Sequence, residues 1–406
     1  MHLTDQDRAK LGGEMGEAVR IAMELVIFAG EAMGADQLLD IGGAHIDGCL
    51  YHGQAGLDFA RRLAEAGGKV VVPTTLNVSS LDLLHPELYR GDVTKCEQSR
   101  ELTCAYEQMG CRPTWTCAPY QLADRPGLGD QVAWGESNAI VFANSVLGAR
   151  TNRYGDFLDI CCALTGRAPA VGLHTDAGRR ATLAVDVTVP DSWLDNTLFY
   201  VGLGLVLGRV AGAEVTTITG LDERADEERL KAVGAAAASS GAVAMFHVAG
   251  LTPEADTLGA TPERHMDVDR VMIGDALARV RGSSGRLGAV SVGTPHASTA
   301  ELERLAALVT GRQTKVPFYV NTGRDVAAQN AGALAGIEAF GATIVTDTCT
   351  YITPIIGDVE GVVMTNSGKW AYYAPANLGV EVALGSLADC VVSAERGEVS
   401  VSGELT

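Results

Sequence analysis

The second half of the chain alternates short apolar runs with longer segments of helical periodicity. Strands are predicted at 214–218, 242–247, 288–292, 316–320 and 343–345, and helices between them at 223–239, 267–281, 298–310 and 324–340. Strands that alternate with helices form parallel sheets, because each crossover helix returns the chain to the edge where it started. This half of the chain is therefore predicted to be doubly wound α/β.

The N-terminal half carries a similar unit, in which a strand, a loop, a helix and a second strand follow one another. These elements are predicted at 38–41, 42–48, 56–66 and 69–72. Ligands bind at the carboxyl ends of parallel strands, where the loops gather. His45, which lies in the loop, and Thr75 and Asn77, which follow the second strand, are therefore candidate site residues.

A change in composition near Gly212 marks the predicted boundary between the two halves. We expect an N-terminal α/β domain at 1–211 and a second, doubly wound α/β domain at 212–345. The remaining residues, 346–406, are expected to complete a central cleft between these domains. A chain of 406 residues is long enough for two or three such units, each with its own core.

Polar side chains are unusually dense between residues 114 and 153. Cys117 stands two residues before Pro119, which favours an extended segment whose thiol can point into a cleft. A run of hydrogen-bonding groups follows, made of Asn138, Asn144, Ser145, Arg150, Thr151 and Arg153. Each such group needs a partner when it is buried, so a run that only filled a core would not hold so many. The run predicts a pocket for a small polar substrate.

The charge and hydropathy pattern excludes several classes of partner. The formal net charge is −19, and an acidic surface repels nucleic-acid phosphates and anionic membranes. Apolar runs long enough to span a bilayer are missing from the sequence, and the N-terminus has neither the basic start nor the apolar core of a signal peptide. We therefore expect a cytoplasmic protein that binds neither nucleic acid nor membrane.

The chain holds nine cysteines, an odd number that argues against a disulfide framework. Cys117 and Cys349 stand out because both follow strands in polar loops instead of lying on apolar helix faces. Two chemical roles remain open at this point. The thiolates could hold a metal or an iron–sulfur cluster, or Cys117 could be a nucleophile paired with His45 or His296.

Several stretches resemble the large, catalytic part of the aconitase X family. They are Thr-Cys-Ala-Pro-Tyr (116–120), Glu-Ser-Asn-Ala (136–139), Ala-Asn-Ser-Val-Leu-Gly-Ala-Arg-Thr-Asn-Arg (143–153), Leu-Thr-Gly-Arg-Ala-Pro (164–169), Thr-Asp-Thr-Cys (346–349) and Thr-Asn-Ser-Gly-Lys with Tyr-Tyr-Ala-Pro (365–375). The resemblance implies an aconitase-like fold with several parallel-rich α/β domains around a central cleft. It also implies a dehydratase with an iron–sulfur cluster, for which we favour [2Fe-2S] over [4Fe-4S].

The resemblance implies a ligand set for the cluster. Cys117 and Cys349 match the loop cysteines of the family, and the helix at 156–164 is similar to one that bears cysteine in bacterial members, so Cys161 or Cys162 is the expected third ligand. Some relatives have Gly-Cys-Pro-His where this chain has Gly-Thr-Pro-His at 293–296. That difference favours the bacterial branch of the family.

The expected reaction is the dehydration of cis-3-hydroxy-L-proline to Δ1-pyrroline-2-carboxylate. We take His45, Ser145 and Lys369 as candidate catalytic residues. The substrate is expected to contact side chains that can bind a carboxylate or a polar group, namely Thr75, Asn77, Asn138, Asn144, Ser145, Arg150, Thr151 and Arg153. The family also has a small swivelling domain, which this chain lacks, so a separate small subunit is expected to complete the site and supply the base.

Three other functions stay open. One is the large subunit of a mevalonate 5-phosphate dehydratase, the second activity that the resemblance implies. Another is a non-catalytic iron-binding or scaffold subunit. The third is a cysteine-dependent hydrolase that uses Cys117 without a metal.

Overall fold

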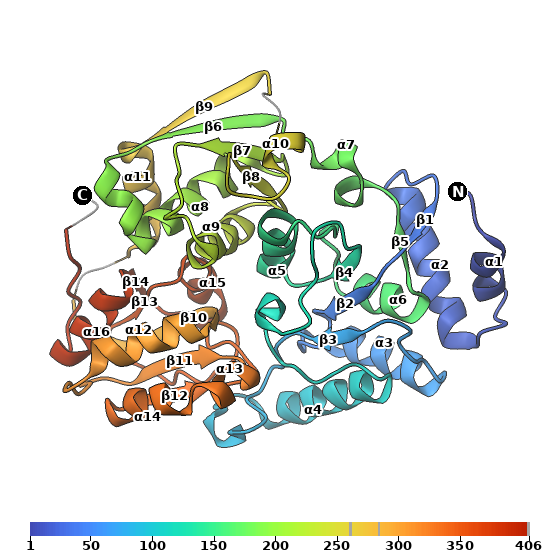
Figure 1. Cartoon of the computed structure of the whole chain (residues 1–406). Helices are drawn as coiled ribbons and strands as arrows, with labels where there is room; N and C mark the ends of the chain where they lie inside the picture. The colour runs from blue at the N-terminus through green and yellow to red at the C-terminus, as the bar shows by residue number, and fades with distance from the viewer. Residues whose placement is uncertain (260–261, 283–284, 404–406) are drawn as a thin grey trace.

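The computed structural model describes residues 1–259, 262–282 and 285–403. These residues form an N-terminal domain on one side of the molecule and two further α/β domains on the other (Figure 1). The parallel-rich sheets and the arrangement of several domains confirm the aconitase-like α/β class expected from the sequence. In the described part of the chain, no helix is both long and apolar enough to cross a membrane.

The N-terminal domain is built on a parallel sheet with the strand order β3-β2-β4 and a short antiparallel pair, β1 with β5. Its strands are β1 (Leu38–Asp40), β2 (Gly43–Ile46), β3 (Thr74–Leu76), β4 (Val132–Trp134) and β5 (Arg167–Pro169). Its helices are α1 (Asp5–Leu11), α2 (Glu17–Ala32), α3 (Gln54–Glu65), α4 (Val93–Gln108), α5 (Ser137–Phe142), α6 (Leu158–Thr165) and α7 (Asp176–Arg179). One core, which includes Met23, Leu57 and Ile160, lies between the helices and the sheet.

The second domain has a parallel sheet in the order β8-β7-β6-β9. Its elements are β6 (Leu183–Thr188), α8 (Thr197–Ala211), β7 (Thr216–Thr219), α9 (Glu227–Ser240), β8 (Phe246–Val248), α10 (Ala255–Leu258), β9 (Arg264–Asp269) and α11 (Arg270–Val280). The apolar helix α8 is nearly all buried, as its composition predicts, and it packs closely on α9. A Cβ atom at Gly204 would lie 2.7 Å from Cβ of Ala236, so glycine permits this approach.

The third domain has a parallel sheet in the order β12-β11-β10-β13-β14. Its strands are β10 (Leu287–Ala297), β11 (Phe318–Thr322), β12 (Ala342–Val345), β13 (Val362–Thr365) and β14 (Val382–Leu384). Its helices are α12 (Thr299–Val309), α13 (Arg324–Gln329), α14 (Ala331–Ala339), α15 (Gly368–Leu378) and α16 (Leu387–Arg396). The order of strands reverses between β10 and β13, which is the place where sheets of this kind open a crevice.

Strand pairing groups the residues differently from the predicted boundaries at 211 and 345. The strand β6 lies before the first boundary, yet it pairs with β7 and β9 of the second domain. In the same way β13 and β14 lie after residue 345, yet they belong to one sheet with β10. A parallel sheet can recruit a strand from far along the chain, so a change in composition does not mark where a sheet ends.

Some predicted elements differ locally. Residues 267–281 were expected to be one helix, but the strand β9 fills 264–269 and α11 begins only at Arg270. The strand expected at 69–72 is found at 74–76. The polar segment at 365–375 becomes the start of α15, because the Ser367 side chain caps it by accepting from the Trp370 amide.

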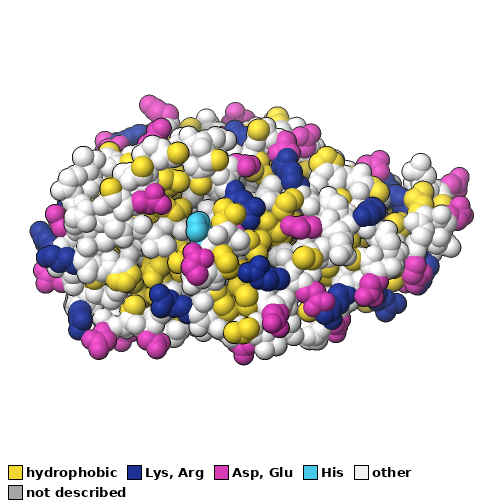
Figure 2. Space-filling model, turned by 90° about the horizontal axis from the view of Figure 1, so that it is seen from below, with side chains coloured by type: hydrophobic (Ala, Val, Ile, Leu, Met, Phe, Trp, Pro, Cys, Tyr) yellow, Lys and Arg dark blue, Asp and Glu magenta, His cyan; other side chains and the backbone are white. Residues whose placement is uncertain are grey.

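On the face seen from below, acidic and basic side chains are intermixed, with hydrophobic side chains between them (Figure 2). The net negative charge of the chain is therefore not gathered into one acidic patch on this face.

Candidate active site

Two cysteines from different domains meet at the centre of the molecule. The Sγ atoms of Cys117 and Cys349 are 3.7 Å apart, and both residues are fully buried. His296, at the end of β10, lies beside them, and its backbone N–H donates to Sγ of Cys117 at 3.3 Å. Within the described residues these three form a group whose ligand atoms all lie within 4.8 Å of one another. The pairing of Cys117 with Cys349 is the one that the sequence predicts.

The loops that carry the two cysteines contain strained backbone. Trp115 and Asp347, each two residues before a cysteine, have φ angles of +46° and +59°, a region that side-chain-bearing residues rarely adopt. Asp347 is held by its contacts: its carboxylate accepts from Arg324 at 2.6 Å and from the backbone N–H of Leu83 at 3.0 Å. Such strain persists only where the surroundings fix the loop, and it is common at functional sites.

The pKa values of the two thiols are shifted in opposite directions. Burial raises the pKa of Cys117, but a hydrogen bond from Cys349 and the electrostatic influence of the neighbouring His296 ring and the Lys369 ammonium lower it to about 6. The hydrogen bond to Cys117, together with burial, raises the pKa of Cys349 well above its usual value. Cys117 is therefore the thiolate of the pair and Cys349 the thiol that donates to it. A thiolate is the form that binds metals.

The hydrogen bonds of His296 leave one ring nitrogen able to act as a ligand. Nε2 lies 3.1 Å from the carbonyl oxygen of Thr348, which can only accept, so Nε2 carries the proton. Nδ1 lies 3.2 Å from Oγ1 of Thr116 and keeps its lone pair. A carbonyl that fixes the tautomer in this way is typical of histidines that bind metals.

A buried ion pair lies next to the sulfur atoms. Nζ of Lys369, in the first turn of α15, donates to Oε1 of Glu136 at 2.6 Å. Asn138 donates to the same oxygen at 2.8 Å and to the carbonyl oxygen of Cys117 at 3.1 Å. Burial alone would raise the pKa of Glu136, but Lys369 and Asn138 lower it to about 2. The pair is therefore fully ionised, and it connects the two domains beneath the cysteines.

The carboxyl ends of β2 and β3 form the other wall of the polar cluster. The Asn77 amide donates to Oε2 of Glu136 at 3.0 Å and also to Oδ1 of Asp47. Nδ1 of His45 lies 2.7 Å from Oγ1 of Thr75. Burial lowers the pKa of His45 to about 4, so its ring is neutral near pH 7. The sequence predicts His45 and Thr75 in loops after strands, whereas the structure has them inside β2 and β3, near the carboxyl ends of these strands, and Asn77 directly follows β3.

The 143–153 motif serves to join the first two domains. Both atoms of the Asn144 amide are bonded, the oxygen accepting from the Thr151 backbone at 3.0 Å and from Arg179 at 3.0 Å. Oγ of Ser145 accepts from the backbone of Phe246 at 2.9 Å, and Arg150 donates to Glu254 at 2.9 Å. The bonds of Ser145 and Arg150 cross the boundary between the N-terminal and second domains, and the Asn144 amide crosses it as well by donating to the carbonyl oxygen of Ala244 at 3.0 Å.

Arg153 is likewise engaged, by carbonyl oxygens at the end of α9. Its guanidinium donates to the carbonyl oxygens of Ala238 at 3.1 Å and Gly241 at 3.2 Å. An arginine in this place stabilises the negative end of the helix. The hydrogen-bonding groups of the 143–153 motif thus have protein atoms as partners. Ser145, Arg150 and Arg153 do not join the cysteine cluster in the structure.

Cys161 and Cys162 lie away from the cysteine pair. Both are fully buried on α6, within the core of the N-terminal domain, whereas Cys117 and Cys349 belong to the core of the second and third domains. Burial raises the pKa of both thiols. Neither is part of the metal-binding group found among the described residues. The structure therefore brings His296, and not these two cysteines, to the pair.

Sequence reasoning did not identify the partner of Lys369. Glu136 lies 233 positions away, and nothing in the local pattern of either residue predicts that they meet. The available signal was positional: Glu136 follows β4 and Lys369 follows β13, so both stand at the carboxyl end of a parallel strand.

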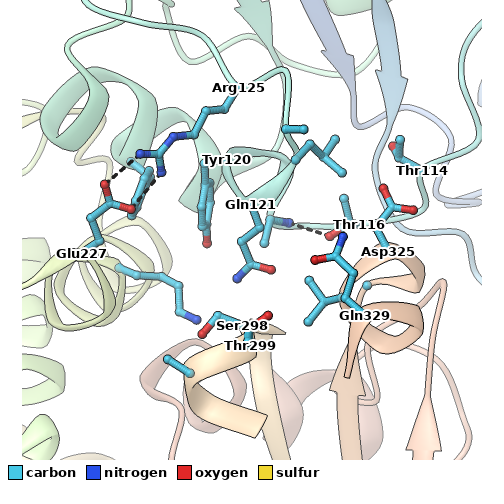
Figure 3. A pocket seen from close by; sticks show the side chains of 18 of the residues that line it. Thr114, Thr116, Tyr120, Gln121, Arg125, Glu227, Ser298, Thr299, Asp325 and Gln329 are labelled. Carbon is cyan, nitrogen blue, oxygen red and sulfur yellow. Dashed lines mark hydrogen bonds and ion pairs between the residues drawn. The ribbon is translucent and has the colours of Figure 1, made fainter. Parts of the chain in front are cut away.

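A cavity of about 520 Å³ opens beside the cysteine loop, where the three domains meet (Figure 3). Thr116 and Gln121 line it from the N-terminal domain, and Ser298 and Thr299 from the third (Figure 3). Gln121 also donates to the carbonyl oxygen of His296 at 3.0 Å. The cavity therefore reaches the residues that surround His296.

Three family models cover nearly the whole chain. They describe the first, second and third domains of aconitase X, and they match residues 1–177, 181–281 and 287–396. These ranges agree with the three domains observed in the structure, since each range holds all the strands of one domain.

Proteins of known name match the chain along most of its length. It is 44% identical to cis-3-hydroxy-L-proline dehydratase of Pseudomonas aeruginosa, over 96% of this chain and 69% of that protein. It is 35% identical to the phosphomevalonate dehydratase large subunit of Methanosarcina mazei, over 100% of both chains.

A solved structure agrees with these matches. The crystal structure of Thermococcus kodakaraensis aconitase X in its holo form superposes with a TM-score of 0.88 at 34% identity, and the match covers 97% of this chain and 100% of that one. The Pseudomonas aeruginosa and Methanosarcina mazei relatives are both dehydratases, and this chain is a hydro-lyase as they are. By its three matching domains, its relatives and its fold, the chain belongs to the aconitase X family.

Proposed function

We propose that this chain dehydrates cis-3-hydroxy-L-proline to Δ1-pyrroline-2-carboxylate, together with a small subunit and an iron–sulfur cluster. The observation that carries the proposal is the Cys117–Cys349–His296 group, which lies directly beside the buried Glu136–Lys369 pair. Identity to the relatives points the same way. It is 44% and 41% to two cis-3-hydroxy-L-proline dehydratases, and 30–36% to the phosphomevalonate dehydratase large subunits.

The donor set fits an iron–sulfur cluster. Cys117 is held as a thiolate, Cys349 is its close neighbour, and His296 presents a lone pair on Nδ1. Three protein ligands leave a coordination position for substrate, and we favour a [2Fe-2S] cluster in this place. When bound, the cluster supplies a Lewis acid for the oxygen that leaves the substrate. The third ligand in this proposal is His296, in place of the Cys161 or Cys162 expected from the sequence.

The other residues of the site bind and orient the substrate. The Glu136–Lys369 pair fixes the carboxamide groups of Asn77 and Asn138, which line both sides of Glu136. Neutral His45 offers a ring nitrogen without charge, so it can accept or donate a hydrogen bond without repelling a zwitterion. The base that removes the C2 proton comes from the small subunit in this proposal, because the carboxylate beside the cysteines, Glu136, is already engaged by Lys369 and Asn77.

The charges near the site favour an amino acid over a phosphorylated acid. Lys369, whose charge acts on both cysteines, is paired with Glu136, and Arg324 is paired with Asp347 of the Cys349 loop. A phosphate group would need cations free to neutralise it. The alternative substrate, mevalonate 5-phosphate, is therefore disfavoured here.

A separate small subunit is proposed because several relatives of this chain, such as the protein of Methanosarcina mazei, are named large subunits. All nine cysteines are free in the structure, which agrees with a reducing, cytoplasmic setting.

The deciding experiment combines the anaerobically purified chain with its candidate small subunit and adds cis-3-hydroxy-L-proline. The product is detected with o-aminobenzaldehyde, and the trans epimer serves as the stereochemical control. We expect turnover of the cis epimer alone, and only when both subunits are present. Turnover of mevalonate 5-phosphate without turnover of hydroxyproline would overturn the substrate assignment. A colourless protein that binds no iron would instead support a non-catalytic scaffold, and loss of activity in Cys117→Ser without loss of metal would support a cysteine hydrolase.

A further inference from the structure

A small cavity lies where the strand order of the third domain reverses. Residues 293–295 line it from β10, and residues 366–368 line it from the turn that follows β13. Residues of α8 and α9 line it from the second domain. Ligands of parallel sheets bind in the crevice at such a reversal. The cavity has a volume of about 40 Å³, and one water needs about 10–15 Å³, so it has room for a few groups of that size.

Two polar atoms at this cavity are buried without a partner. Oγ1 of Thr294 has no hydrogen bond within the described part of the chain, and the residue is only 6% exposed. Oδ1 of Asn366 is also buried and also lacks a partner there. A hydroxyl group can donate, whereas an amide oxygen can only accept. Buried polar atoms are nearly always bonded, so the cavity calls for a ligand that offers both an acceptor and a donor.

The helix α15 begins at the same cavity. The first N–H groups of a helix have no acceptor within it, and the Ser367 side chain accepts only from that of Trp370. The N–H groups of Gly368 and Lys369 are therefore left over at the start of α15. Thr197, the first residue of α8, lines the cavity as well. Helix N-termini favour negative groups, so the acceptor on the ligand is best supplied by a carboxylate.

The charged side chains around the cavity balance in sign. Three are acidic and three are basic, namely Asp226, Glu228, Glu301, Arg229, Lys231 and Arg304. Arg229 is paired with Asp226, and Lys231 is paired with both Glu228 and Glu301. A phosphate site gathers an excess of cations, which this cavity does not have. A ligand whose own charges cancel fits better.

A larger hollow of about 650 Å³ adjoins the small cavity. Both are lined by the same four residues, Thr197, Glu301, Arg304 and Asn366. The hollow is also lined by apolar side chains, among them Leu198, Leu308 and Leu387. It therefore gives room to the hydrophobic body of a ligand whose polar end lies in the small cavity.

We propose that the small cavity binds the head group of a small α-amino acid, with the carboxylate at Thr294 and the start of α15 and the ammonium at Asn366. The inference does not depend on the proposed reaction, because it follows from the lining of the cavity. The amino acid has two sources, the hydroxyproline substrate itself or a free amino acid that acts as an effector. His296 directly follows residues 293–295, and Lys369 directly follows Gly368, so either ligand would lie close to the site.

The test measures the binding of two unreactive probes to the full, anaerobically purified chain by calorimetry. L-proline carries the ammonium and the carboxylate, whereas cyclopentanecarboxylate keeps only the carboxylate. We expect the wild type to bind L-proline more tightly by about tenfold or more, because hydrogen bonds to charged groups are the stronger ones.

Two variants separate the two ends of the head group. Thr294→Val keeps the shape of the side chain and should weaken the binding of both probes by about tenfold. Asn366→Leu removes the acceptor for the ammonium and should weaken the binding of L-proline alone. Thr216→Val is the matched control, because it removes another buried hydroxyl without a partner in the described chain, on β7 and outside the lining of the cavity. It should leave both affinities unchanged.

Folding of the variants is checked by urea unfolding. Thr294→Val removes a hydroxyl that has no partner, so it should be as stable as the wild type or more so. Equal binding of the two probes by the wild type would overturn the inference. So would a wild-type affinity for L-proline in either Thr294→Val or Asn366→Leu.

Inhibition of hydroxyproline turnover by L-proline distinguishes the two sources of the ligand. Competitive inhibition identifies the cavity as the place of the substrate's own head group, and non-competitive inhibition identifies an effector. A chain that shows the expected binding pattern but dehydrates no hydroxyproline would overturn the proposed function and leave this inference in place.

Discussion

Nζ of Lys369 lies 2.6 Å from Oε1 of Glu136, and the two residues are 233 positions apart in the chain. Both side chains are nearly fully buried, so the pair joins the N-terminal domain to the third domain inside the molecule. Removing one partner leaves the other charge buried without compensation, which is far more costly than removing both.

Lys369→Met should therefore lower the free energy of unfolding by about 3–5 kcal/mol. The double variant Lys369→Met with Glu136→Gln should lose less than the sum of the two single variants, because neither charge is then left alone. Urea unfolding of the apoprotein, monitored by circular dichroism, would measure all three. Strict additivity would contradict the coupling.

Iron content should depend on His296 and not on the cysteines of α6. Anaerobically purified Cys117→Ser, Cys349→Ser and His296→Ala should each lose most of their iron and acid-labile sulfide. Cys162→Ala should retain both, and Cys390→Ala, which changes a buried thiol in the third domain, is the control for packing effects. Loss of iron in Cys162→Ala with retention in His296→Ala would restore the ligand set expected from the sequence.

Acid should destabilise the protein through His174. Its ring is buried, with Nδ1 2.6 Å from Oε1 of Gln131 and Nε2 2.6 Å from the hydroxyl of Tyr154. Burial, aided by Arg179 and Arg150, lowers its pKa from 6.5 to about 4. Between these values the unfolded chain binds a proton that the folded protein does not, so stability falls as the pH drops from 6.5 towards 4.

This shift corresponds to roughly 3 kcal/mol across that pH range. Urea unfolding at pH 7, 6 and 5 would measure it, with His174→Asn as the comparison, since asparagine does not titrate. The variant should be less stable than the wild type at pH 7 and should lose less stability on acidification. Equal pH dependence in the two proteins would show that His174 is not responsible.

The close contact between α8 and α9 leaves no room for a side chain at Gly204, so a larger residue there should destabilise the fold. Gly204→Ala would place a methyl group 2.7 Å from Cβ of Ala236 and closer still to the carbonyl oxygen of Val233. We expect a loss of about 1–3 kcal/mol in thermal or urea unfolding. Gly274→Ala, on α11 with open space around it, is the matched control and should be neutral or stabilising. Equal effects at both positions would contradict the packing argument.

The sequence was sufficient to predict the fold class and two of the three residues in the Cys117–Cys349–His296 group. Alternating strands and helices predict parallel sheets, and Cys117 and Cys349 are predicted together because both follow strands in polar loops. Asn77 follows β3 as expected, but His45 lies inside β2 and not in a loop after the 38–41 strand, which pairs with β5 in another sheet. A local pattern cannot reveal which strand a sheet recruits from elsewhere, and this is why the domain boundaries at 211 and 345 divide sheets.

The 143–153 motif shows the limit of the argument from polar density. The sequence predicts a substrate pocket here, but in the structure Asn144 and Ser145 are buried, Arg153 is exposed, and all three bond to backbone atoms of the second domain. A sequence shows how many polar groups need partners, yet a ligand and a neighbouring domain meet that need equally well. Cys161 and Cys162 have a similar ambiguity, because a buried helix accepts thiols as small apolar residues.

The placement of Cys117 and Cys349 has a consequence for how the enzyme matures. The two thiols are 232 positions apart and come from different domains, so the proposed iron site cannot form until the third domain has been synthesised and docked on the first. Cofactor binding would then be a late step in folding. The bound cofactor would cross-link the first and third domains. A ribosome-bound nascent chain that ends before β12 could not hold the metal, however well its first domain had folded.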